Sequence, residues 1–525
     1  MSGWRTPPAA VEESRITETL RTQVAVVGLG HAGTAALRAL AEAGVPAIGI
    51  EQMQQGRFSV YGCDIGHINS AFLAARGVPR VDPIDLYNEM MRRSGNKANP
   101  GLMMRFAQGC GDAFDWYVDR FDADALADVQ VTYFPCGRYF DGEISGYRFW
   151  PGTAEFPGIW TKGSPTLTEL TRANQEKARQ CGAQTAFGAE ALYLESEAGR
   201  VTGLIARFDD ERYVRILAER GVILAAGDFG GNPEMRQELC SDVRELFEPG
   251  DHFSGSGRSG RGIQMGLWAG GRLEAGPIAA MGGNDGLAPS LTDRSAVLIL
   301  DETGRRFCNE SLGDPVFVGQ AFGQRHHGVS YQVFDSDVLE DLERLPPSHG
   351  SFDINNRERV GRLLDAMDKA VEAGPGGYEV KTRPTAVIYA GGTVGELLDN
   401  AGFTGALRQT AEREILRYQA VCRLGRDDDF GKDPKMLRPM DRAPFFLQKV
   451  ERNVIGNMLV TVGGLVTDER QRVLDENYRP IGGLFATGNC CGLRFGPQYS
   501  TPMPGVSIAM AITLGREAGR EAGKE

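Results

Sequence analysis

Three glycines and one glutamate carry the first chemical signal in the sequence. Gly28, Gly30 and Gly33 form the pattern GxGxxG, and Glu51 follows about 20 residues further on. In such a loop the first glycine allows a tight turn, the second lets the backbone approach a pyrophosphate, and the third lets a helix pack closely. A glutamate at that distance can accept hydrogen bonds from ribose hydroxyls. The pattern alone is weak, and it predicts a dinucleotide site only between a strand and a helix.

The residues around these glycines supply that strand and that helix. Residues 22–28 read TQVAVVG, an apolar and β-branched run that is typical of a buried parallel strand. Residues 32–43 are rich in Ala and Leu, which favours a helix, and residues 45–51 (VPAIGIE) predict the next strand. A β-turn-α-β unit of this size corresponds to one mononucleotide-binding half. The sequence therefore favours a dinucleotide over an ordinary glycine turn.

Charge and cysteine content exclude several classes of protein. The 57 basic and 69 acidic residues give a net charge of −12, so no basic field would attract nucleic acid or anionic lipid. The nine cysteines include no CxxC pair, which argues against zinc ribbons and thioredoxin chemistry. No export signal or apolar spanning segment is visible. We expect a cytoplasmic protein that binds no nucleic acid and does not insert into a membrane.

Further motifs stand in an order that resembles one known family. They are RVTGL, GVILAAGDFGGNPEM, GRGIQMGLWAGG, LILDETGRRFCNE and GGLVTDERQRVLDENYRPIGGLFATGN. Together with VAVVGLGHAG they resemble the flavoprotein subunits of fumarate reductases and succinate dehydrogenases. That family also includes 3-ketosteroid dehydrogenases and soluble ene-reductases. The resemblance covers about residues 22 to 519.

The resemblance implies FAD as the cofactor. Ser59 stands where membrane-bound members carry the histidine that links covalently to the flavin, so non-covalent FAD is expected. Asp228 stands where the family usually has another glycine. The residues for which cofactor contacts are implied are Gly28, Gly30, Ala32, Gly33, Glu51, Gly227, Asn489, Gly505, Val506, Ser507 and Ile508.

The pattern of residue types along the chain indicates how it is organised into domains. Residues 280–435 combine strand-like segments (AVLIL and SYQVF) with charged segments that favour helices. After Pro444 the sequence again has the Gly-rich pattern of strands and turns. We expect an α/β protein with a Rossmann-like FAD-binding domain, split in sequence, and an inserted α+β capping domain. The expected boundaries are an N-terminal arm over 1–21, FAD-binding parts over 22–279 and 436–525, and a capping domain over 280–435.

The resemblance also implies hydride transfer at flavin N5 to or from a C=C or CH–CH bond. Fumarate reductases use an arginine acid and hold two carboxylates with histidine and arginine, but the corresponding positions here are Leu339, Val460 and Pro502. Tyr499 instead matches a tyrosine of ketosteroid dehydrogenases, although the glycine four residues on is Met503. A phenol can donate a proton or polarise a carbonyl without carrying charge. These features favour a neutral ring substrate, either a steroid enone or an isoflavonoid or other polyphenol.

Two further residues join Tyr499 as candidate catalytic groups. Arg494 lies in the loop expected to face the flavin, where it would bind an anionic group or the flavin, or be a surface arginine. Glu310 ends RRFCNE, a family position where a carboxylate relays protons or pairs with an arginine. Both alternatives stay open for each residue.

The candidate substrate residues are His67, Tyr139 and Trp160. His67 belongs to YGCDIGHINS, a segment that the fold would carry alongside the flavin ring, unless it is a hydrogen-bonded loop histidine. Tyr139 and Trp160 lie in an aromatic and Gly-rich segment over residues 133–163, which would suit a planar apolar substrate. The neighbouring His326 and His327 would point in different directions, so no metal site is expected.

Two other functions remain open at this stage. A dicarboxylate reductase would need a different arginine, such as Arg494 or Arg258. A non-enzymatic flavoprotein would transfer electrons without acting on a small alkene. The sequence contains no haem motif and no obvious second flavin site, so we expect a small-molecule substrate and an external electron donor or acceptor.

Overall fold

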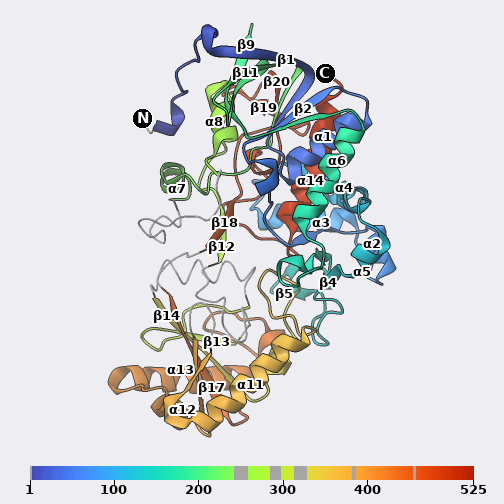
Figure 1. Cartoon of the computed structure of the whole chain (residues 1–525). Helices are drawn as coiled ribbons and strands as arrows, with labels where there is room; N and C mark the ends of the chain where they lie inside the picture. The colour runs from blue at the N-terminus through green and yellow to red at the C-terminus, as the bar shows by residue number, and fades with distance from the viewer. Residues whose placement is uncertain (1–2, 242–257, 284–296, 312–327, 381–385, 453–456) are drawn as a thin grey trace.

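The computed structural model describes residues 3–241, 258–283, 297–311, 328–380, 386–452 and 457–525. Figure 1 shows two units, one above the other, which we call the main unit and the capping unit. Strands β12 (Ala280–Gly283) and β18 (Asn457–Thr461) form an antiparallel pair that runs between them.

The main unit is built on an eight-stranded sheet. Its order is β19-β20-β10-β11-β1-β2-β8, with β9 paired to β10. β1 pairs in parallel with β2 and β11, and its end, residues 24–27, is buried. Val24 and Val26 on one face belong to a different apolar cluster from Ala25 and Val27 on the other, so both faces are covered. The strands are β1 (Ile16–Val27), β2 (Ala47–Glu51), β8 (Gln184–Phe187), β9 (Ala189–Glu197), β10 (Arg200–Phe208), β11 (Tyr213–Leu224), β19 (Arg472–Leu474) and β20 (Pro480–Ala486).

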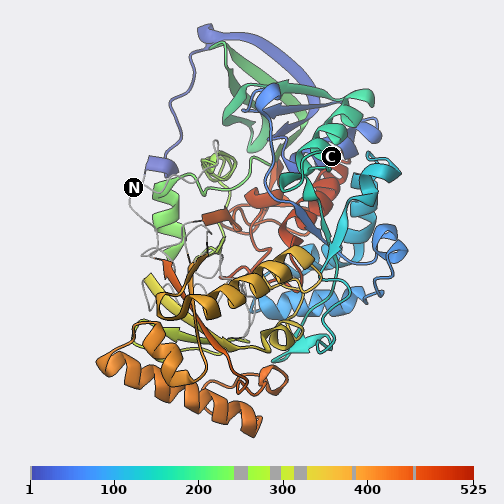
Figure 2. The ribbon, with the colours of Figure 1, turned by 60° about the horizontal axis from the view of Figure 1, so that its bottom comes forward.

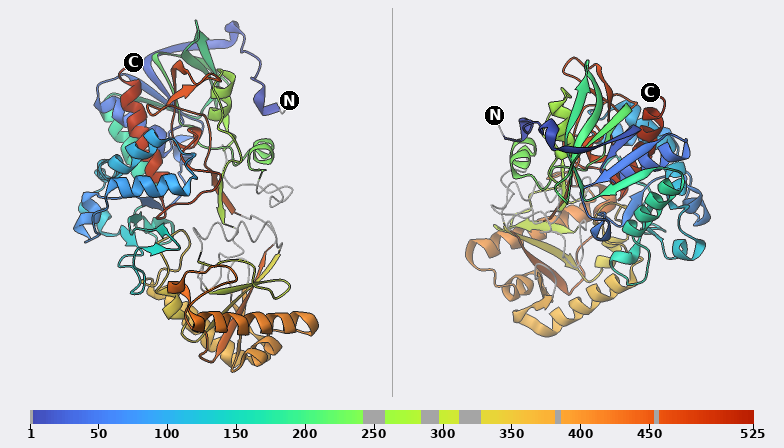
Figure 3. Two further views of the ribbon diagram at one scale, coloured as in Figure 1. Left: turned by 180° about the vertical axis from the view of Figure 1, so that it is seen from behind. Right: turned by 45° about the horizontal axis from the view of Figure 1, so that its top comes forward.

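Helices α1 (His31–Glu42) and α14 (Val506–Ala522) pack closely beside this sheet, as the rear view in Figure 3 shows. Glycine makes this approach possible, because a Cβ atom on Gly515 or Gly519 would lie 2.4 Å from a carbonyl oxygen of α1. The other helices of the main unit are α2 (Ala71–Ala75), α3 (Pro83–Arg93), α4 (Pro100–Val118), α5 (Ala123–Ala127), α6 (Leu167–Gln180), α7 (Pro233–Leu239) and α8 (Arg261–Trp268).

Two small sheets lie between the main sheet and the capping unit. One has the order β3-β7-β4, and the other is the hairpin β5-β6. Their strands are β3 (Asp64–Gly66), β4 (Gln130–Thr132), β5 (Glu143–Ile144), β6 (Tyr147–Arg148) and β7 (Thr153–Glu155).

The capping unit is an antiparallel sheet with helices packed against it. The strand order is β13-β14-β17-β16-β15, and separate apolar clusters are buried against it. Figure 2 shows the helices of this unit packed around its sheet. The elements are β13 (Leu298–Asp301), β14 (Gly328–Asp335), α10 (Val338–Leu342), α11 (Arg357–Ala373), β15 (Tyr378–Val380), β16 (Ala386–Gly391), α12 (Val394–Asn400), α13 (Gly405–Leu424) and β17 (Phe445–Arg452).

The α/β architecture with a parallel sheet and a separate antiparallel unit is confirmed. The expected strand, helix and strand around the GxGxxG pattern correspond to β1, α1 and β2. The boundaries differ in two places. β17 lies beyond residue 435 and pairs with β14 and β16, so the capping sheet reaches Arg452. Residues 16–21 of the expected N-terminal arm belong to β1 and pair with β11.

Among the described residues, no helix is both long enough and apolar enough to cross a membrane. In the same part of the chain, no group of three or more His, Cys, Asp or Glu side chains is arranged to hold a metal ion.

Candidate functional site

A long cleft lies where β1, β2 and β11 end and where α1 and α14 begin. Its empty volume is about 1650 Å³, counting the space at its open mouth. Ligands of open α/β sheets bind at this edge, outside the carboxyl ends of the strands. The expected cofactor residues that line the cleft are Gly28, Gly30, Ala32, Glu51, Gly227, Asn489, Gly505, Ser507 and Ile508.

The glycine loop forms one wall of the cleft. A Cβ atom on Gly33 would lie 1.8 Å from the carbonyl oxygen of Gly28, so this glycine allows α1 to pack against the turn rather than lining the cleft. A Cβ atom on Gly30 would meet nothing within 4 Å, and that position faces open space. Glu51 accepts hydrogen bonds from the backbone N–H groups of Leu29 (2.9 Å) and Met53. It therefore fixes the loop as well as lining the cleft.

The opposite wall is made where β11 and β20 end and where α14 begins. Gly227, Gly488 and Gly505 have φ angles of 80°, 58° and 78°, a backbone region that favours glycine. Val506 is buried behind this wall and is not part of the lining. The cleft therefore combines exposed glycine backbone with two helix N-termini, whose free N–H groups attract anions. These residues fit a long dinucleotide that carries phosphates.

Among the residues that the structure describes, two arginines line the cleft, and each is held by a carboxylate. Arg258 Nη2 lies 3.0 Å from Asp228 Oδ1, and Asp228 also accepts a hydrogen bond from Gly230 N. Arg261 Nη2 lies 3.4 Å from Glu190 Oε1. Asp228, which stands where the resemblance implies a glycine, thus forms an ion pair with Arg258.

Tyr499 is buried and lines the cleft. Its hydroxyl oxygen accepts a hydrogen bond of 3.3 Å from Ser507 N in the first turn of α14. Its ring packs against Phe495, with ring centroids 4.9 Å apart. The phenol can therefore face a bound molecule from a fixed position.

Arg494 lies behind the cleft, not in it. It is fully buried, and it donates hydrogen bonds to Asn489 Oδ1 (2.6 Å) and to Cys491 O. Burial lowers the pKa of its guanidinium from the usual value. Arg494 therefore supports the lining residue Asn489.

Glu310 lies in a buried ionic cluster of the capping unit. Its carboxylate pairs with Arg306 (2.9 Å) and lies 3.4 Å from Lys432 Nζ, and Arg306 also pairs with Asp427. Burial opposes ionisation of Glu310, but Lys432 and Arg306 nevertheless hold its pKa below the usual value. These contacts correspond to the structural pairing considered for Glu310, and the residue does not line the cleft.

The segment that contains His67 does run along the cleft, but through other residues. Tyr61, Gly62 and Asp64 line it, whereas His67 is buried and stacks on Phe114 at a centroid distance of 3.8 Å. His67 also bonds to Ile65 O and Ser70 Oγ, and burial lowers its pKa to about 3. This is the hydrogen-bonded histidine that the sequence left as the alternative.

The two aromatic candidates also lie outside the cleft lining. Trp160 is 73% exposed and Tyr139 is 39% exposed. The guanidinium groups of Arg138 and Arg344 lie 4.6 and 4.4 Å from the centroid of the Tyr139 ring. Two residues at the positions that correspond to fumarate-binding residues lie in different parts of the structure. Val460 lines the cleft, whereas Leu339 packs against the core of the capping unit.

Asp64 and His349 are among the titratable residues of the cleft that the sequence analysis did not single out. Asp64 comes from β3, and burial raises the pKa of its carboxyl to about 6. His349 comes from the loop between α10 and α11 of the capping unit. Asp64 could have been found from its position in the segment that was already singled out. No local pattern marks His349.

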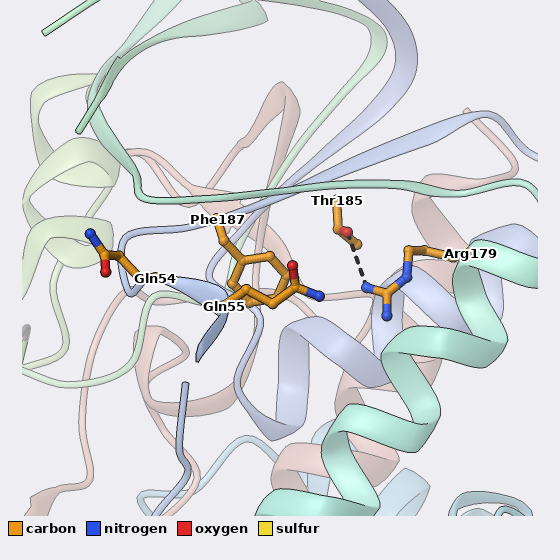
Figure 4. A pocket seen from close by; sticks show the side chains of 5 residues that line it. All are labelled: Gln54, Gln55, Arg179, Thr185 and Phe187. Atoms are coloured by element: carbon orange, nitrogen blue, oxygen red, sulfur yellow. Dashed lines mark hydrogen bonds between the residues drawn. The ribbon is translucent and has the colours of Figure 1, made fainter. Parts of the chain in front are cut away.

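A second, shallower depression of about 810 Å³ lies at the outer edge of the main sheet. Figure 4 shows its lining, with a hydrogen bond of 3.2 Å from Arg179 Nη1 to Thr185 Oγ1. Arg179 is also held by Glu176, and the remaining lining residues are Gln54, Gln55 and Phe187. Its guanidinium is thus already neutralised by a carboxylate.

Comparison with known proteins gives one family and several relatives. A sequence model described as "FAD binding domain" matches residues 23–506. The chain is 26% identical over 518 residues to the vinyl phenol reductase of Lactiplantibacillus plantarum, covering 95% of this chain and 96% of that protein. It is 24% identical over 542 residues to the urocanate reductase of Eggerthella lenta, covering 99% and 78% respectively.

A solved structure of similar fold is a 3-ketosteroid-Δ4-(5α)-dehydrogenase from Rhodococcus jostii RHA1. The TM-score is 0.67 at 21% identity, with 98% of this chain and 99% of that chain covered.

Proposed function

We propose a substrate class for this chain, which belongs to the FAD binding domain family of fumarate reductase-like flavoproteins. The proposed substrate is a neutral ring compound. The chain is an FAD-dependent reductase or dehydrogenase of the class that acts on C=C and CH–CH bonds. The proposal concerns the substrate, which we take to be a steroid enone or a phenolic compound such as an isoflavonoid.

FAD, when bound, supplies or accepts the hydride. The residues of this chain that would hold it are the glycine loop, Glu51, Asn489 and the first turn of α14. We also propose that attachment is non-covalent, because Ser59 lines the cleft and a serine hydroxyl is a weak nucleophile. Release of intact FAD on heat denaturation would test this.

The charge of the cleft is the observation that carries the proposal. In the described part of the lining, each arginine has a carboxylate partner, Asp228 for Arg258 and Glu190 for Arg261. Tyr499 adds a neutral phenol. Two substrate carboxylates would need unpaired cations to offset their desolvation, whereas a ketone or phenol oxygen needs hydrogen-bond donors only.

Two of these relatives support a neutral ring substrate. The vinyl phenol reductase is named for a neutral phenol, and the steroid dehydrogenase was solved with 4-androstene-3,17-dione. Urocanate reductase is named for a carboxylate, so the family accommodates both kinds of substrate.

Anaerobic reoxidation of the flavin tests the proposal. The FAD-loaded protein is reduced chemically, and its spectrum is followed after addition of a steroid enone, an isoflavone, 4-vinylphenol or fumarate. We expect at least one neutral compound to reoxidise the flavin much faster than fumarate does. Reoxidation by fumarate alone would overturn the neutral substrate.

A dicarboxylate reductase is the second candidate, because Arg258 does line the cleft. It would require Arg258 to leave Asp228, and Arg258→Gln would then abolish fumarate turnover. Either function needs an external electron donor or acceptor, which we propose to be a separate redox partner.

A further inference from the structure

His349 brings an imidazole from the capping unit to the first turn of α14. Its Nε2 atom accepts a hydrogen bond of 3.3 Å from Gly505 N, the residue that precedes the helix. The His349 and Tyr499 rings are 5.7 Å apart between centroids and inclined by 50°. Both side chains line the cleft, although they come from different units of the protein.

The two rings share one anchor. Gly505 N donates to His349, and Ser507 N donates to the hydroxyl oxygen of Tyr499 at 3.3 Å. Both amides belong to the start of a 17-residue helix, where the helix dipole creates positive potential. That potential disfavours a charged imidazolium. Since Nε2 accepts a hydrogen bond, the proton of the neutral ring lies on Nδ1, which makes Nδ1–H a donor.

The loop that carries His349 is fixed on both sides of the histidine. Ser348 and Ser351 are buried, and their hydroxyl oxygens are 3.0 Å apart. The Tyr133 hydroxyl donates a hydrogen bond of 3.0 Å to Ser351 O. Tyr133 belongs to the main unit, so the loop is held at the junction of the two units and presents the imidazole from a defined position.

We propose that His349 is a catalytic residue, and that its imidazole and the Tyr499 phenol together bind one oxygen atom of the neutral substrate. This inference rests on the proposed function. Two hydrogen-bond donors on a ketone oxygen withdraw electrons from the conjugated C=C bond. The carbon farther from the oxygen would then accept the hydride that reduced FAD supplies when bound, and the nearer carbon would accept a proton from water. The product has taken up two electrons and two hydrogens.

Binding to the oxidised, FAD-loaded protein tests this without turnover. The probes are 4-ethylphenol and ethylbenzene, which differ by one hydroxyl group. We expect His349→Ala to weaken binding of 4-ethylphenol roughly tenfold and to leave ethylbenzene unchanged, because one hydrogen bond is lost. His349→Asn, which keeps an N–H near Nδ1, should retain part of the preference. An unchanged preference for the phenol in His349→Ala would overturn the inference.

Kinetics of a double variant add a second readout. If both rings bind the same oxygen, His349→Ala and Tyr499→Phe together should lower kcat/KM by less than the product of the single effects. Multiplicative effects would count against a shared oxygen. If no neutral alkene reoxidises the reduced wild-type flavin, the proposed function fails before any variant is compared, so the two failures are distinguishable.

Discussion

Arg494 donates a hydrogen bond of 2.6 Å to Asn489 Oδ1 from a fully buried position. Its second hydrogen bond goes to the backbone oxygen of Cys491, so one planar guanidinium joins two parts of the loop after β20. Asn489 lines the cleft directly in front of it. The sequence suggests Arg494 as a ligand of an anionic group or of the flavin, or as a surface arginine, whereas in the structure it is buried and supports a lining residue.

Arg494→Lys should therefore lower the affinity for FAD rather than for substrate. Lysine cannot reproduce the fork of donors, so Asn489 loses its fixed orientation. We expect the dissociation constant of FAD to rise roughly tenfold or more, as measured by quenching of flavin fluorescence. Arg179→Lys is the matched control, because Arg179 lies at the outer edge of the sheet, and it should leave FAD binding unchanged (Figure 4). Full FAD affinity in Arg494→Lys would contradict a supporting role.

Gly33→Ala should abolish FAD binding. The added methyl group would lie 1.8 Å from Gly28 O, so α1 would have to move away from the glycine turn. We expect a loss of stability of about 1–3 kcal/mol together with the loss of bound flavin. Gly56→Ala is the control, because its Cβ atom would meet nothing within 4 Å. Thermal unfolding and flavin content of the purified proteins measure both effects, and normal flavin content in Gly33→Ala would refute the packing argument.

The glycine turn could be predicted from sequence because its geometry is local. β1, the turn and α1 are consecutive in the chain, Gly28 has a φ of 92°, and a Cβ atom on Gly33 would meet Gly28 O within the same segment. His67 shows where such reasoning ends. The segment does run along the cleft, but the side chains that line the cleft there are those of Tyr61 and Asp64, whereas His67 stacks on Phe114 in the core.

Features that depend on distant pairing were missed or displaced. His349 lies on a loop of the capping unit that reaches Gly505, far away in sequence, and only the assembled fold brings them together. The capping boundary was placed too early because β17 joins its sheet by pairing with β14 and β16. Neither contact leaves a periodic pattern within its own segment.

Asp228→Asn should make the cleft more receptive to anions. Asp228 is the carboxylate partner of Arg258, so its neutralisation leaves a cation in the lining. We expect the dissociation constant of succinate for the FAD-loaded protein to fall roughly tenfold and to increase with salt concentration. The double variant Asp228→Asn with Arg258→Gln is the control and should lose the gain. Equal succinate binding in the wild type and Asp228→Asn would mean that the pair does not set the charge of the cleft.

Asp64 should make the protein less stable as pH rises from about 4 to about 6. Burial raises the pKa of its carboxyl from the usual 3.8 to about 6, so the folded state holds a proton that the unfolded state loses in this window. The cost is absent below the unfolded pKa and is complete above the folded pKa, where it reaches about 3 kcal/mol. The amide side chain introduced by Asp64→Asn cannot ionise. The urea concentration at the unfolding midpoint of Asp64→Asn should therefore rise relative to that of the wild type as the pH increases between those two values. Its cross-strand partner Glu155, whose pKa is also raised by burial, remains in both proteins. Asp210→Asn is the control, because it removes an exposed carboxylate instead. Parallel curves of stability against pH for the wild type and Asp64→Asn would rule out the ionisation of Asp64 as the cause.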